Sequence, residues 1–542
     1  MPKFIFITGG VVSSLGKGIV ASSLASLLQL GSYNVRVRKL DPYLNIDPGT
    51  MNPSQHGEVF VTQDGAETDM DLGHYERFTG IISKKSDNIT SGKIYSEVLR
   101  KERKGDYLGS TVQVIPHVTN EIKKFIKADL KNEDFIICEI GGTVGDIEGL
   151  PFLEAIRQLR NELGKSKTLF IHLTLIPYIN TANEFKTKPT QHSVKELLSV
   201  GIQPDLLICR TTENITKDSK QKISLFCNLP INSVVNSVDV DSIYEVPQSL
   251  YNEKIHTRIF DFFNINKKKK INLSKWNTFN KKISNVNQSV KIAIVGKYIN
   301  LSESYKSLNE ALFHSGVFNN VKVNLSWIDA VTLKNQSICK KFLSNYDGIL
   351  VPGGFGERGA LGKINAIKYS RLNKTPFLGI CFGMQLAVIE SARNIKGYEK
   401  ASSTEFGKSE LPIISLISEW TENSKIFKLD KSKKGGSMRL GSYQSVLTPK
   451  SRIYNIYKKK NIYERHRHRY EVNYEYLNIL EKNGVVFSGM SPDMKLAEAM
   501  ELKNHPWFLG VQFHPELKST PFKPHPIFNS FIKKISQLSK NK

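Results

Sequence analysis

Short, unbroken apolar runs that end at a glycine or polar turn recur along this sequence and restrict its fold most strongly. They occupy residues 4–8, 135–140, 169–175 and 206–209 in the first half, and residues 290–295, 348–351 and 377–380 in the second. A strand that is covered on both faces of a parallel sheet has this continuous pattern, whereas a half-exposed strand alternates. Helical patterns follow several runs, so the sequence predicts an α/β chain with open, doubly wound sheets.

The length of the chain, 542 residues, exceeds what one hydrophobic core supports. Residues 264–288 are rich in lysine, asparagine and serine and poor in apolar side chains, as linkers commonly are. We therefore expect two doubly wound domains, residues 1–265 and 289–542, joined by a linker at residues 266–288. Ligands of such sheets bind at the carboxyl ends of the strands, where the glycine-rich turns lie.

The composition is that of an ordinary globular protein, with 40% hydrophobic and 23% charged residues. No stretch approaches the roughly 18 apolar residues that a membrane-spanning helix needs. The short apolar N-terminus runs directly into a glycine loop, which favours a buried strand over a signal peptide. We expect a cytoplasmic protein with no membrane partner.

The net charge of +25 raises the possibility of a nucleic-acid partner. However, the lysines are spread along the chain, and no nucleic-acid-binding motif accompanies them, so a solvated lysine-rich surface and no nucleic-acid partner are expected. The five cysteines form no CxxC pair or Cys/His cluster, which argues against disulfides and a structural zinc site. Four of them are expected to be small core residues, and Cys381 is the exception.

A glycine-rich loop at residues 9–18, Gly-Gly-Val-Val-Ser-Ser-Leu-Gly-Lys-Gly, separates a predicted strand from a predicted helix at residues 19–30. Backbone N–H groups and the helix N-terminus can surround phosphate oxygens here, and Lys17 can reach the terminal phosphates. The match to the P-loop is imperfect, because the spacer is one residue longer and Gly18 replaces the Ser or Thr that holds magnesium. The position of the lysine favours phosphate binding over a plain glycine turn.

The missing hydroxyl predicts that magnesium is held by carboxylates from elsewhere in the domain. Asp71 lies in an acidic stretch with Asp69, and Glu139 lies near a strand end, where a Walker-B acid would be. Asp69 and Asp71 could instead cap the helix that follows. Lys39, at the end of another apolar run, and residues 186–191, with two lysines, two hydroxyls and an amide, are further candidates for binding anions.

Residues 379–383, Gly-Ile-Cys-Phe-Gly, have the form of a nucleophile elbow between a strand and a helix. His514 would activate the thiol of Cys381, and Glu516 would orient the imidazole. The Pro-Gly-Gly turn at residues 352–354 could supply an oxyanion N–H group. Each piece alone is ambiguous, but together they predict a cysteine acyl-transfer site.

Two sets of these motifs resemble known families. Residues 352–354, 379–383 and 514–516 resemble class I glutamine amidotransferase domains. The first half is more similar to the CTP synthase family, and this resemblance extends over essentially the whole chain. It rests on residues 9–18, 39–42, 55–60, 65–69, 73–78, 139–148, 186–192, 438–441 and 465–471. It implies an N-terminal P-loop-like amidoligase (synthetase) domain and a C-terminal class I glutaminase domain.

The resemblance implies an ATP-dependent carbon–nitrogen ligase of pyrimidine nucleotide biosynthesis. In this family ATP and Mg²⁺ phosphorylate O4 of UTP, and ammonia then displaces the phosphate at C4 to give CTP. Glutamine supplies the ammonia through a thioester at a Cys381, His514 and Glu516 site. The resemblance also implies GTP as an activator, CTP as a feedback inhibitor and a homotetramer.

Roles for individual residues follow from the same resemblance. The ATP site would contain Ser14, Leu15, Gly16, Lys17, Gly18, Ile19, Lys39 and Asp71, and the magnesium ligands would be Asp71 and Glu139. UTP or CTP would contact Ser13, Asp146, Ile147, Glu148, Lys186, Thr187, Lys188, Pro189, Thr190, Gln191 and Lys222. Glutamine would contact Gly354, Phe382, Gly383, Met384, Gln385, Glu405 and Arg469. Glu357 and Phe382 depart from the family pattern, although the backbone N–H group of Phe382 is unchanged.

Two other functions remain open. An ATP-dependent amidotransferase that acts on a cofactor carboxylate would share the two-domain plan, although residues 146–148 and 186–191 favour UTP. A P-loop switch ATPase with a degenerate second domain would not need an intact cysteine site. Residues 101–109 could form a lid for GTP or an ordinary exposed loop.

Overall fold

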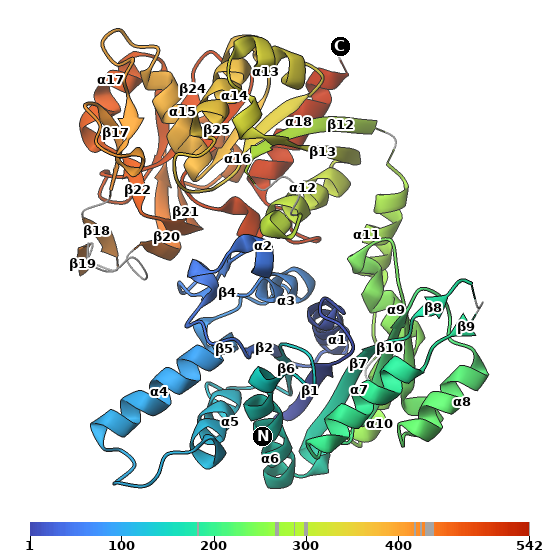
Figure 1. Cartoon of the computed structure of the whole chain (residues 1–542). Helices are drawn as coiled ribbons and strands as arrows, with labels where there is room; N and C mark the ends of the chain where they lie inside the picture. Colours follow the sequence, from blue (N-terminus) through green and yellow to red (C-terminus); the bar gives the residue numbers. More distant parts are fainter. Residues whose placement is uncertain are drawn as a thin grey trace. The chain divides into compact units, whose positions relative to one another are not determined.

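The computed structural model describes residues 1–181, 184–265, 270–286, 288–297, 302–416, 419–422, 425–428 and 438–540. The chain divides into two compact units (Figure 1). Met1–Met51 and Thr68–Lys281 form the first, and Asn52–Glu67 and Lys282–Lys542 form the second. Residues 52–67, from the first half of the sequence, therefore fold with the second unit. The domain boundaries expected from the sequence are contiguous and do not include this exchange.

A parallel sheet of seven strands forms the centre of the first unit, in the order β11-β10-β7-β1-β6-β2-β5. Its strands are β1 (Lys3–Gly9), β2 (Val35–Asp41), β5 (Asn88–Thr90), β6 (Phe135–Ile140), β7 (Thr168–Leu175), β10 (Leu206–Thr211) and β11 (Val234–Val238). The four apolar runs of the first half coincide with β1, β6, β7 and β10. The predicted parallel sheet is confirmed because these strands are buried along nearly their whole length.

Helices cover both faces of this sheet (Figure 1). On one face α1 (Lys17–Leu30) packs against α3 (Asp71–Thr79), α9 (Val246–Asn252) and α10 (Ile255–Phe262). On the other face α4 (Ser91–Lys104), α5 (Thr119–Lys127), α6 (Leu150–Leu163) and α7 (Lys188–Ser199) share one apolar core. The remaining elements are α8 (Lys217–Phe226) and the short strands β8 (Tyr178–Ile179) and β9 (Glu184–Phe185). The unit is doubly wound, as predicted.

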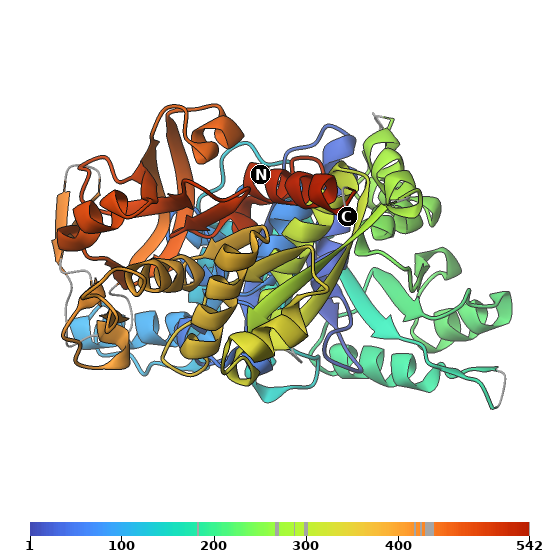
Figure 2. The same cartoon turned by 90° about the horizontal axis from the view of Figure 1, so that it is seen from above.

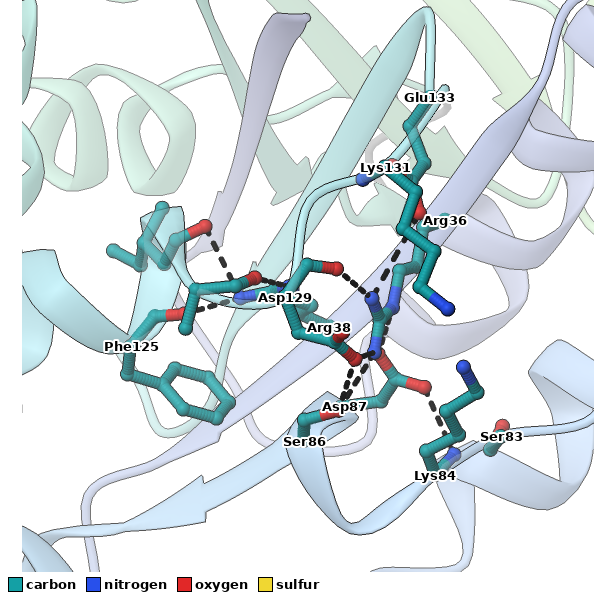
Figure 3. Close-up of polar contacts among 12 residues, drawn as sticks. Arg36, Arg38, Ser83, Lys84, Ser86, Asp87, Phe125, Asp129, Lys131 and Glu133 are labelled. Carbon is teal, nitrogen blue, oxygen red and sulfur yellow. Dashed lines mark hydrogen bonds and ion pairs between the residues drawn. The ribbon is translucent and has the colours of Figure 1, made fainter.

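Two buried arginines of β2 are held by polar groups of the segments around them (Figure 3). Arg36 pairs with Asp87 and, at 3.1 Å, with Asp129. Arg38 donates to carbonyl groups at the end of α5, including that of Ile126 at 3.1 Å. Because side chains alternate along a strand, Lys39 lies on the opposite face. The two arginines thereby fix the strand that carries Lys39.

The segment expected to be a linker contains a helix that the sequence did not predict. In α11 (Ser274–Ser284) the side chains of Trp276 and Phe279 are buried and contact Tyr244. Trp276 Nε1 donates to Ser26 Oγ at 3.0 Å. This helix therefore packs into the first unit. Residues 266–269 and 287 of the expected linker lie outside the described residues.

A sheet of nine strands forms the centre of the second unit, in the order β13-β12-β14-β15-β25-β24-β23-β20-β21. The first five strands are parallel, and the others join antiparallel. The strands are β12 (Gln288–Gly296), β13 (Val321–Asp329), β14 (Gly348–Val351), β15 (Phe377–Ile380), β20 (Arg439–Leu447), β21 (Asn461–His468), β23 (Val485–Met490), β24 (Ala497–Leu502) and β25 (Phe508–Val511). The apolar runs of the second half coincide with β12, β14 and β15.

Helices lie on both sides of this sheet (Figure 2), and two apolar cores flank it. One contains α12 (Lys306–Phe318), α16 (Arg452–Tyr457) and α18 (Pro526–Ser539), and the other contains α13 (Gln336–Leu343), α14 (Ala360–Asn373), α15 (Phe382–Ala392) and α17 (Leu477–Lys482). Smaller elements are α2 (Pro53–His56), β3 (Phe60–Val61), β4 (Glu67–Thr68), β16 (Ser402–Ser403), β17 (Pro412–Leu416), β18 (Glu419–Glu422), β19 (Lys425–Lys428) and β22 (Tyr470–Val472). The predicted class of two doubly wound domains therefore holds for this half as well.

Segment 52–67 is held in the second unit by several polar contacts. Arg465 donates to the carbonyl oxygen of Val61 at 3.0 Å, and Arg467 Nε lies 2.7 Å from Glu67 Oε1. The backbone N–H of Ser442 donates to a carbonyl of the same segment at 2.9 Å. The segment is therefore a structural part of the second unit.

All five cysteines are free and buried. Within the described ranges, no helix combines the length and the apolar character needed to cross a membrane.

Candidate functional sites

The glycine-rich loop joins β1 to α1 in a compact, left-handed path. Val11, Ser14 and Gly16 adopt φ values of 77°, 56° and 97°. Lys17 Nζ donates to the carbonyl oxygen of Gly142 at 2.7 Å, so the lysine lies between two glycine turns. Burial lowers the pKa of Lys17, and the charge of Glu139 acts against this effect. A cation in such a position is available to phosphate oxygens.

Four carboxylates surround the buried Lys39 at the carboxyl end of β2. Lys39 Nζ pairs with Asp71, lies 3.0 Å from Glu139 Oε1, and lies 3.8 Å from both Asp41 Oδ1 and Asp69 Oδ1. Burial alone would lower the pKa of Lys39, but Asp71 and Glu139 raise it well above its ordinary value. Burial and the like charge of Asp71 raise the pKa of Glu139. Burial acts in the same direction on Asp71, but Lys39 overrides it and holds the pKa of Asp71 below its usual range.

The unusual glycine at position 18 has a direct structural reason. A Cβ atom on Gly18 would lie 2.1 Å from Asp71 Oδ1. The carboxylate of Asp71 therefore occupies the space that the Ser or Thr side chain of a P-loop would fill. Asp69 Oδ1 accepts a hydrogen bond from the backbone N–H of Asp71 at 2.9 Å, at the start of α3. Asp69 thus supports the helix start, while Asp71 faces the phosphate loop.

Asp71 and Glu139 fit a magnesium ion by their chemistry and their proximity. Both carboxylates reach the same Lys39 Nζ, so they are close enough to share one cation. Magnesium usually binds one or two carboxylates together with substrate phosphates and water. No group of three or more His, Cys, Asp and Glu side chains in the described parts of the chain is arranged to hold a metal.

Tyr75 belongs to this cluster, although the sequence analysis gave it no role. Its hydroxyl donates to Glu139 Oε2 from α3. Tyr75 lies in the motif at residues 73–78, but its partner Glu139 is remote in the sequence, so its role could not be predicted from local spacing.

The residues expected to bind the pyrimidine nucleotide lie in separate groups. Asp146 Oδ2 accepts from the backbone N–H of Thr143 at 2.9 Å, and Glu148 and Ile147, which is 80% exposed, follow it. Ser13 lies in the exposed part of the phosphate loop. We find no hydrogen bond or ion pair among the described residues that joins Asp146–Glu148 to the segment at 186–191.

The second group gathers at the start of α7. Lys186 pairs with Glu184, and the hydrogen bond from Lys186 and the charge of Lys222 lower the pKa of Glu184. Gln191 Nε2 donates to Thr187 Oγ1 at 3.1 Å. Lys188 and Pro189 form the first turn of the helix, and the buried Thr190 donates to the carbonyl of Leu175. Lys186 and Lys222 are therefore brought together, whereas Thr190 has a structural contact.

Cys381 stands in a sharp turn between β15 and α15. Its φ and ψ angles are 52° and −104°, a conformation that few L-residues adopt. A Cβ atom on Gly383 would lie 2.1 Å from the carbonyl oxygen of Val351, so no larger residue fits there. The backbone N–H of Cys381 donates to Val511 at 2.7 Å. This is the geometry of a nucleophile elbow.

His514 and Glu516 accompany the thiol. His514 Nδ1 lies 2.7 Å from Glu516 Oε1. A Cβ atom on Gly353 would lie 2.9 Å from His514 Cε1 and 3.8 Å from Cys381 Cβ, so one glycine borders both side chains. Burial alone would lower the pKa of His514, but Glu516 and Cys381 raise it to about 10. His514 Nε2 is buried and has no hydrogen-bond partner among the described residues, which leaves it available for proton transfer.

Two residues that the sequence analysis did not assign contact the sulfur. Gln512 Nε2 lies 3.7 Å from Cys381 Sγ, and the carbonyl oxygen of Arg467 lies 3.9 Å from it. Gln512 stands two residues before His514 in the same motif, and Arg467 lies two residues before the predicted Arg469. Sequence spacing alone did not show which of them reach the thiol.

The residues expected to bind glutamine surround the same elbow. Glu405 Oε1 accepts from the backbone N–H of Gly356 at 2.7 Å, next to the predicted Gly354. Gln385 Nε2 donates to the carbonyl of Tyr470 at 2.8 Å. Burial and Glu405 raise the pKa of Tyr470, and Arg469 opposes them, so Glu405 and Arg469 both act on this region. These contacts link the predicted positions to the glycine loop at residues 353–356 and to the segment at residues 469–470.

The side chains of some residues predicted to contact glutamine point away from the thiol. Met384 is fully buried in an apolar core of the unit, so its backbone alone is available to a ligand. The ring of Phe382 contacts Phe406, with 6.1 Å between the centroids, and also faces Lys363. The exposed Glu357 lies away from the core.

Comparisons with known proteins cover the whole chain. A family model described as "CTP synthase N-terminus" matches residues 3–265, and one described as "Glutamine amidotransferase class-I" matches residues 300–534. The CTP synthase of Pelagibacter ubique (strain HTCC1062) is 62% identical over 533 residues, 98% of this chain and 99% of the relative. That of Paramagnetospirillum magneticum is 60% identical over 533 residues, 98% of each chain.

One solved structure with a related sequence is the glutaminase domain of Trypanosoma brucei CTPS with bound acivicin. It is 35% identical, covers 46% of this chain and 94% of its own, and has a TM-score of 0.41. The elbow cysteine with its histidine and glutamate in one unit, and the glycine-rich loop with its lysine in the other, are features of a glutamine-dependent ligase. The family within this class follows from the matches that cover 98% of the chain. The chain belongs to the CTP synthase family.

Family membership confirms the predicted fold class and the prediction of a ligase that takes nitrogen from glutamine. It decides against a cofactor-carboxylate amidotransferase and a switch ATPase. The roles of the individual site residues stay predictions.

Proposed function

We propose that this chain makes CTP from UTP in two half-reactions, one in each unit. In the first unit ATP phosphorylates the uracil O4, and ammonia displaces that phosphate at C4. In the second unit glutamine is hydrolysed to supply the ammonia. The observation that carries the proposal is the elbow at Cys381, which has its own base, in a chain whose other unit holds a buried cluster of lysine and carboxylates.

The synthetase half uses the charged groups around Lys39. ATP phosphates bind the loop at residues 14–19, and Lys17 and Lys39 balance their charge. Asp71 and Glu139 hold Mg²⁺, which when bound neutralises the charge of the transferred phosphoryl group. Asp71 stands against Gly18, so its carboxylate borders the loop and would be able to hold the ion there. This contact supports Asp71 as the replacement for the missing P-loop hydroxyl.

The uridine nucleotide is held by hydroxyl, amide and ammonium groups of the first unit. The proposed set is Ser13, Asp146 to Glu148, Lys186 to Gln191 and Lys222. Lys186 and Lys222 act on the same carboxylate, Glu184, which supports a shared anion site for the triphosphate. A bound phosphate would take the place of that carboxylate as the partner of the two lysines.

The glutaminase half is acyl transfer through a thioester. The thiolate of Cys381 attacks the carboxamide carbon of glutamine, and His514 donates the proton with which ammonia leaves. Backbone N–H groups of Gly354 and Phe382 stabilise the oxyanion. Water then hydrolyses the thioester and releases glutamate. Glu516, 2.7 Å from His514, supports the charged imidazole that this sequence requires.

The glutamine backbone is held by charged and amide groups around the elbow. Glu405 attracts its ammonium group, and Arg469 attracts its carboxylate. Gln385, and the backbone of Gly383 and Met384, complete the site. The opposite effects of Glu405 and Arg469 on Tyr470 support their placement near one another.

The resemblance to the family supports four further proposals. GTP activates the enzyme, CTP inhibits it, the active form is a homotetramer, and the protein works in the cytoplasm. We also propose residues 1–265 as the synthetase domain and residues 289–542 as the glutaminase domain, with segment 52–67 packed on the latter.

The direct test supplies ammonia and follows ATP hydrolysis with UTP and, separately, with a carboxylate acceptor. UTP is expected to stimulate hydrolysis and to yield one CTP for each ATP consumed. Hydrolysis that UTP does not stimulate would overturn the proposal.

A further inference from the structure

Lys363 is a buried lysine beside the glutaminase site that the proposed mechanism does not use. It lies on α14, its exposed fraction is 0%, and its Nζ has no hydrogen-bond partner among the described residues. An ammonium group without a partner in the protein interior costs free energy. Its presence in this position therefore calls for a compensating role.

The ammonium group points at the backbone around the thiol. A Cβ atom on Gly354 would lie 3.4 Å from Lys363 Nζ. Nζ also lies 5.0 Å from the centroid of the Phe382 ring. Gly354 and Phe382 are the two residues whose N–H groups we assign to the oxyanion. Lys363 thus stands directly behind the place where negative charge develops.

The other charged groups around Lys363 come from three further elements. They are Lys297 after β12, Cys381 after β15 and Glu405 after β16. Burial lowers the pKa of Lys363 to about 7, Lys297 lowers it as well, and Cys381 and Glu405 raise it. Lys297 donates to the carbonyl of Gly356 at 3.2 Å, and Glu405 accepts from the N–H of the same residue. Both neighbours are therefore engaged with the glycine loop, which leaves the charge of Lys363 available.

We propose that Lys363 is a positioning residue of the glutaminase site whose positive charge, held behind Gly354 and Phe382, favours the thiolate and the oxyanion. The role rests on the proposed function of Cys381. A charge in a water-poor interior is weakly screened, so it acts through the thin backbone layer that separates it from the reacting atoms. Because the ammonium has no hydrogen-bond partner among the described residues before the anion forms, its effect is greater on the transition state than on the bound substrate.

Three variants separate charge from shape. Lys363→Met keeps the length of the side chain and removes the charge, and Lys363→Arg keeps the charge. Lys368→Met makes the same change at a half-buried lysine of the same helix and serves as the control. Lys363→Met is expected to lower kcat of glutamine-dependent synthesis roughly tenfold, less than the loss of a direct oxyanion donor. Lys363→Arg is expected to recover part of this loss, and Lys368→Met to resemble the wild type.

A second readout follows the thiol without turnover. The rate of alkylation of Cys381 by iodoacetamide is measured across neutral pH in each variant. The wild type is expected to react faster than Lys363→Met at low pH, and the ratio is expected to fall as pH rises through about 7, where Lys363 loses its proton. For Lys363→Arg, which stays charged, the ratio is expected to stay constant.

The unfolding temperature gives a third readout, and in Lys363→Met it is expected to rise while the activity falls. Removing an unpaired buried charge relieves its desolvation cost, so Lys363→Met is expected to unfold at a higher temperature than the wild type. A lower temperature would show that the ammonium has a stabilising partner and would overturn the proposal. An unchanged alkylation profile, or an equal loss of glutamine- and ammonia-dependent synthesis, would overturn it too. Failure of the proposed function would appear separately, as glutamine-dependent synthesis that survives in Cys381→Ala.

Discussion

Lys39 in the first unit and Lys363 in the second are both buried lysines next to a reactive site, but their surroundings are opposite. Lys39 stands among four carboxylates, with the nearest distances at Asp71 and Glu139. Lys363 has no hydrogen-bond partner in the described parts of the chain and faces the backbone beside Cys381. The first lysine balances negative charge that is already present. The second supplies positive charge at a place where negative charge develops only during the proposed reaction.

The difference matches what each half-reaction adds to its site. In the proposed reaction magnesium and ATP would bring both signs of charge to the first unit, so the paired cluster could exchange Lys39 for the metal without leaving a carboxylate unpaired. Glutamine hydrolysis brings no charge of its own to the carbonyl group and creates an anion only as the reaction proceeds. A site that is already strained at Cys381 and positively charged nearby suits that need.

The largest effect on the first unit is expected from Asp71→Asn. The amide cannot replace the carboxylate for the metal and leaves Lys39 partly uncompensated. CTP formation is expected to fall by about 10²–10³-fold with glutamine and with ammonia alike. The exposed Asp241→Asn serves as the control in the same unit. A loss confined to glutamine as the nitrogen source would contradict the assignment of Asp71.

A smaller but more specific effect is expected at Gly18. Gly18→Ser restores the hydroxyl of the P-loop, but its Cβ would stand 2.1 Å from Asp71 Oδ1. Activity with ammonia is therefore expected to fall about tenfold to a hundredfold, with a raised KM for ATP. Gly18→Ala should be equally impaired because the clash lies at Cβ. A serine variant that is much more active than the alanine variant would show that the hydroxyl takes over the role of Asp71.

In the second unit, Glu516→Gln removes the negative charge that stabilises the protonated imidazole of His514. Because Glu516 and Cys381 raise the pKa of His514 to about 10, the variant is expected to titrate at lower pH, which NMR of the His514 ring can follow. Glutamine-dependent kcat is expected to fall roughly tenfold, and ammonia-dependent synthesis to stay unchanged.

The same change has a stability consequence with a definite sign. A group with a raised pKa contributes stability below its unfolded value, near 6.5, and this contribution is lost as pH rises through about 10. Glu516→Gln should therefore be less stable than the wild type at neutral pH, and the difference should shrink at high pH. The exposed Glu475→Gln serves as the control. A stability difference between variant and wild type that stays constant across this pH range would contradict the interaction between Glu516 and His514.

Much of the fold was predictable because its signals are local. Continuous apolar runs identified β1, β6, β7, β10, β12, β14 and β15, and the glycine pattern located the turns that follow two of them. The helix α11 was missed because Trp276 and Phe279 bury it through contacts that are remote in sequence. Local signals likewise did not show that segment 52–67 folds with the second unit, since its partners include Arg465.

The sites were predictable to a different extent. The absence of a hydroxyl at Gly18 pointed to a carboxylate, and the structure brings Asp71 to that space. Lys363 could not be found from the sequence, because a lysine in a helical segment normally lies at the surface. Its role depends on a fold that buries it behind a turn formed by another strand.

The most direct measurement compares two nitrogen sources in Cys381→Ala. Removing the thiol deletes the glutaminase nucleophile and leaves the cluster of Lys39, Asp71 and Glu139 intact. We expect CTP formation from glutamine to disappear, and formation from added ammonia to remain within about twofold of the wild type. An equal loss with both sources would contradict the account of two chemically separate sites in one synthesis.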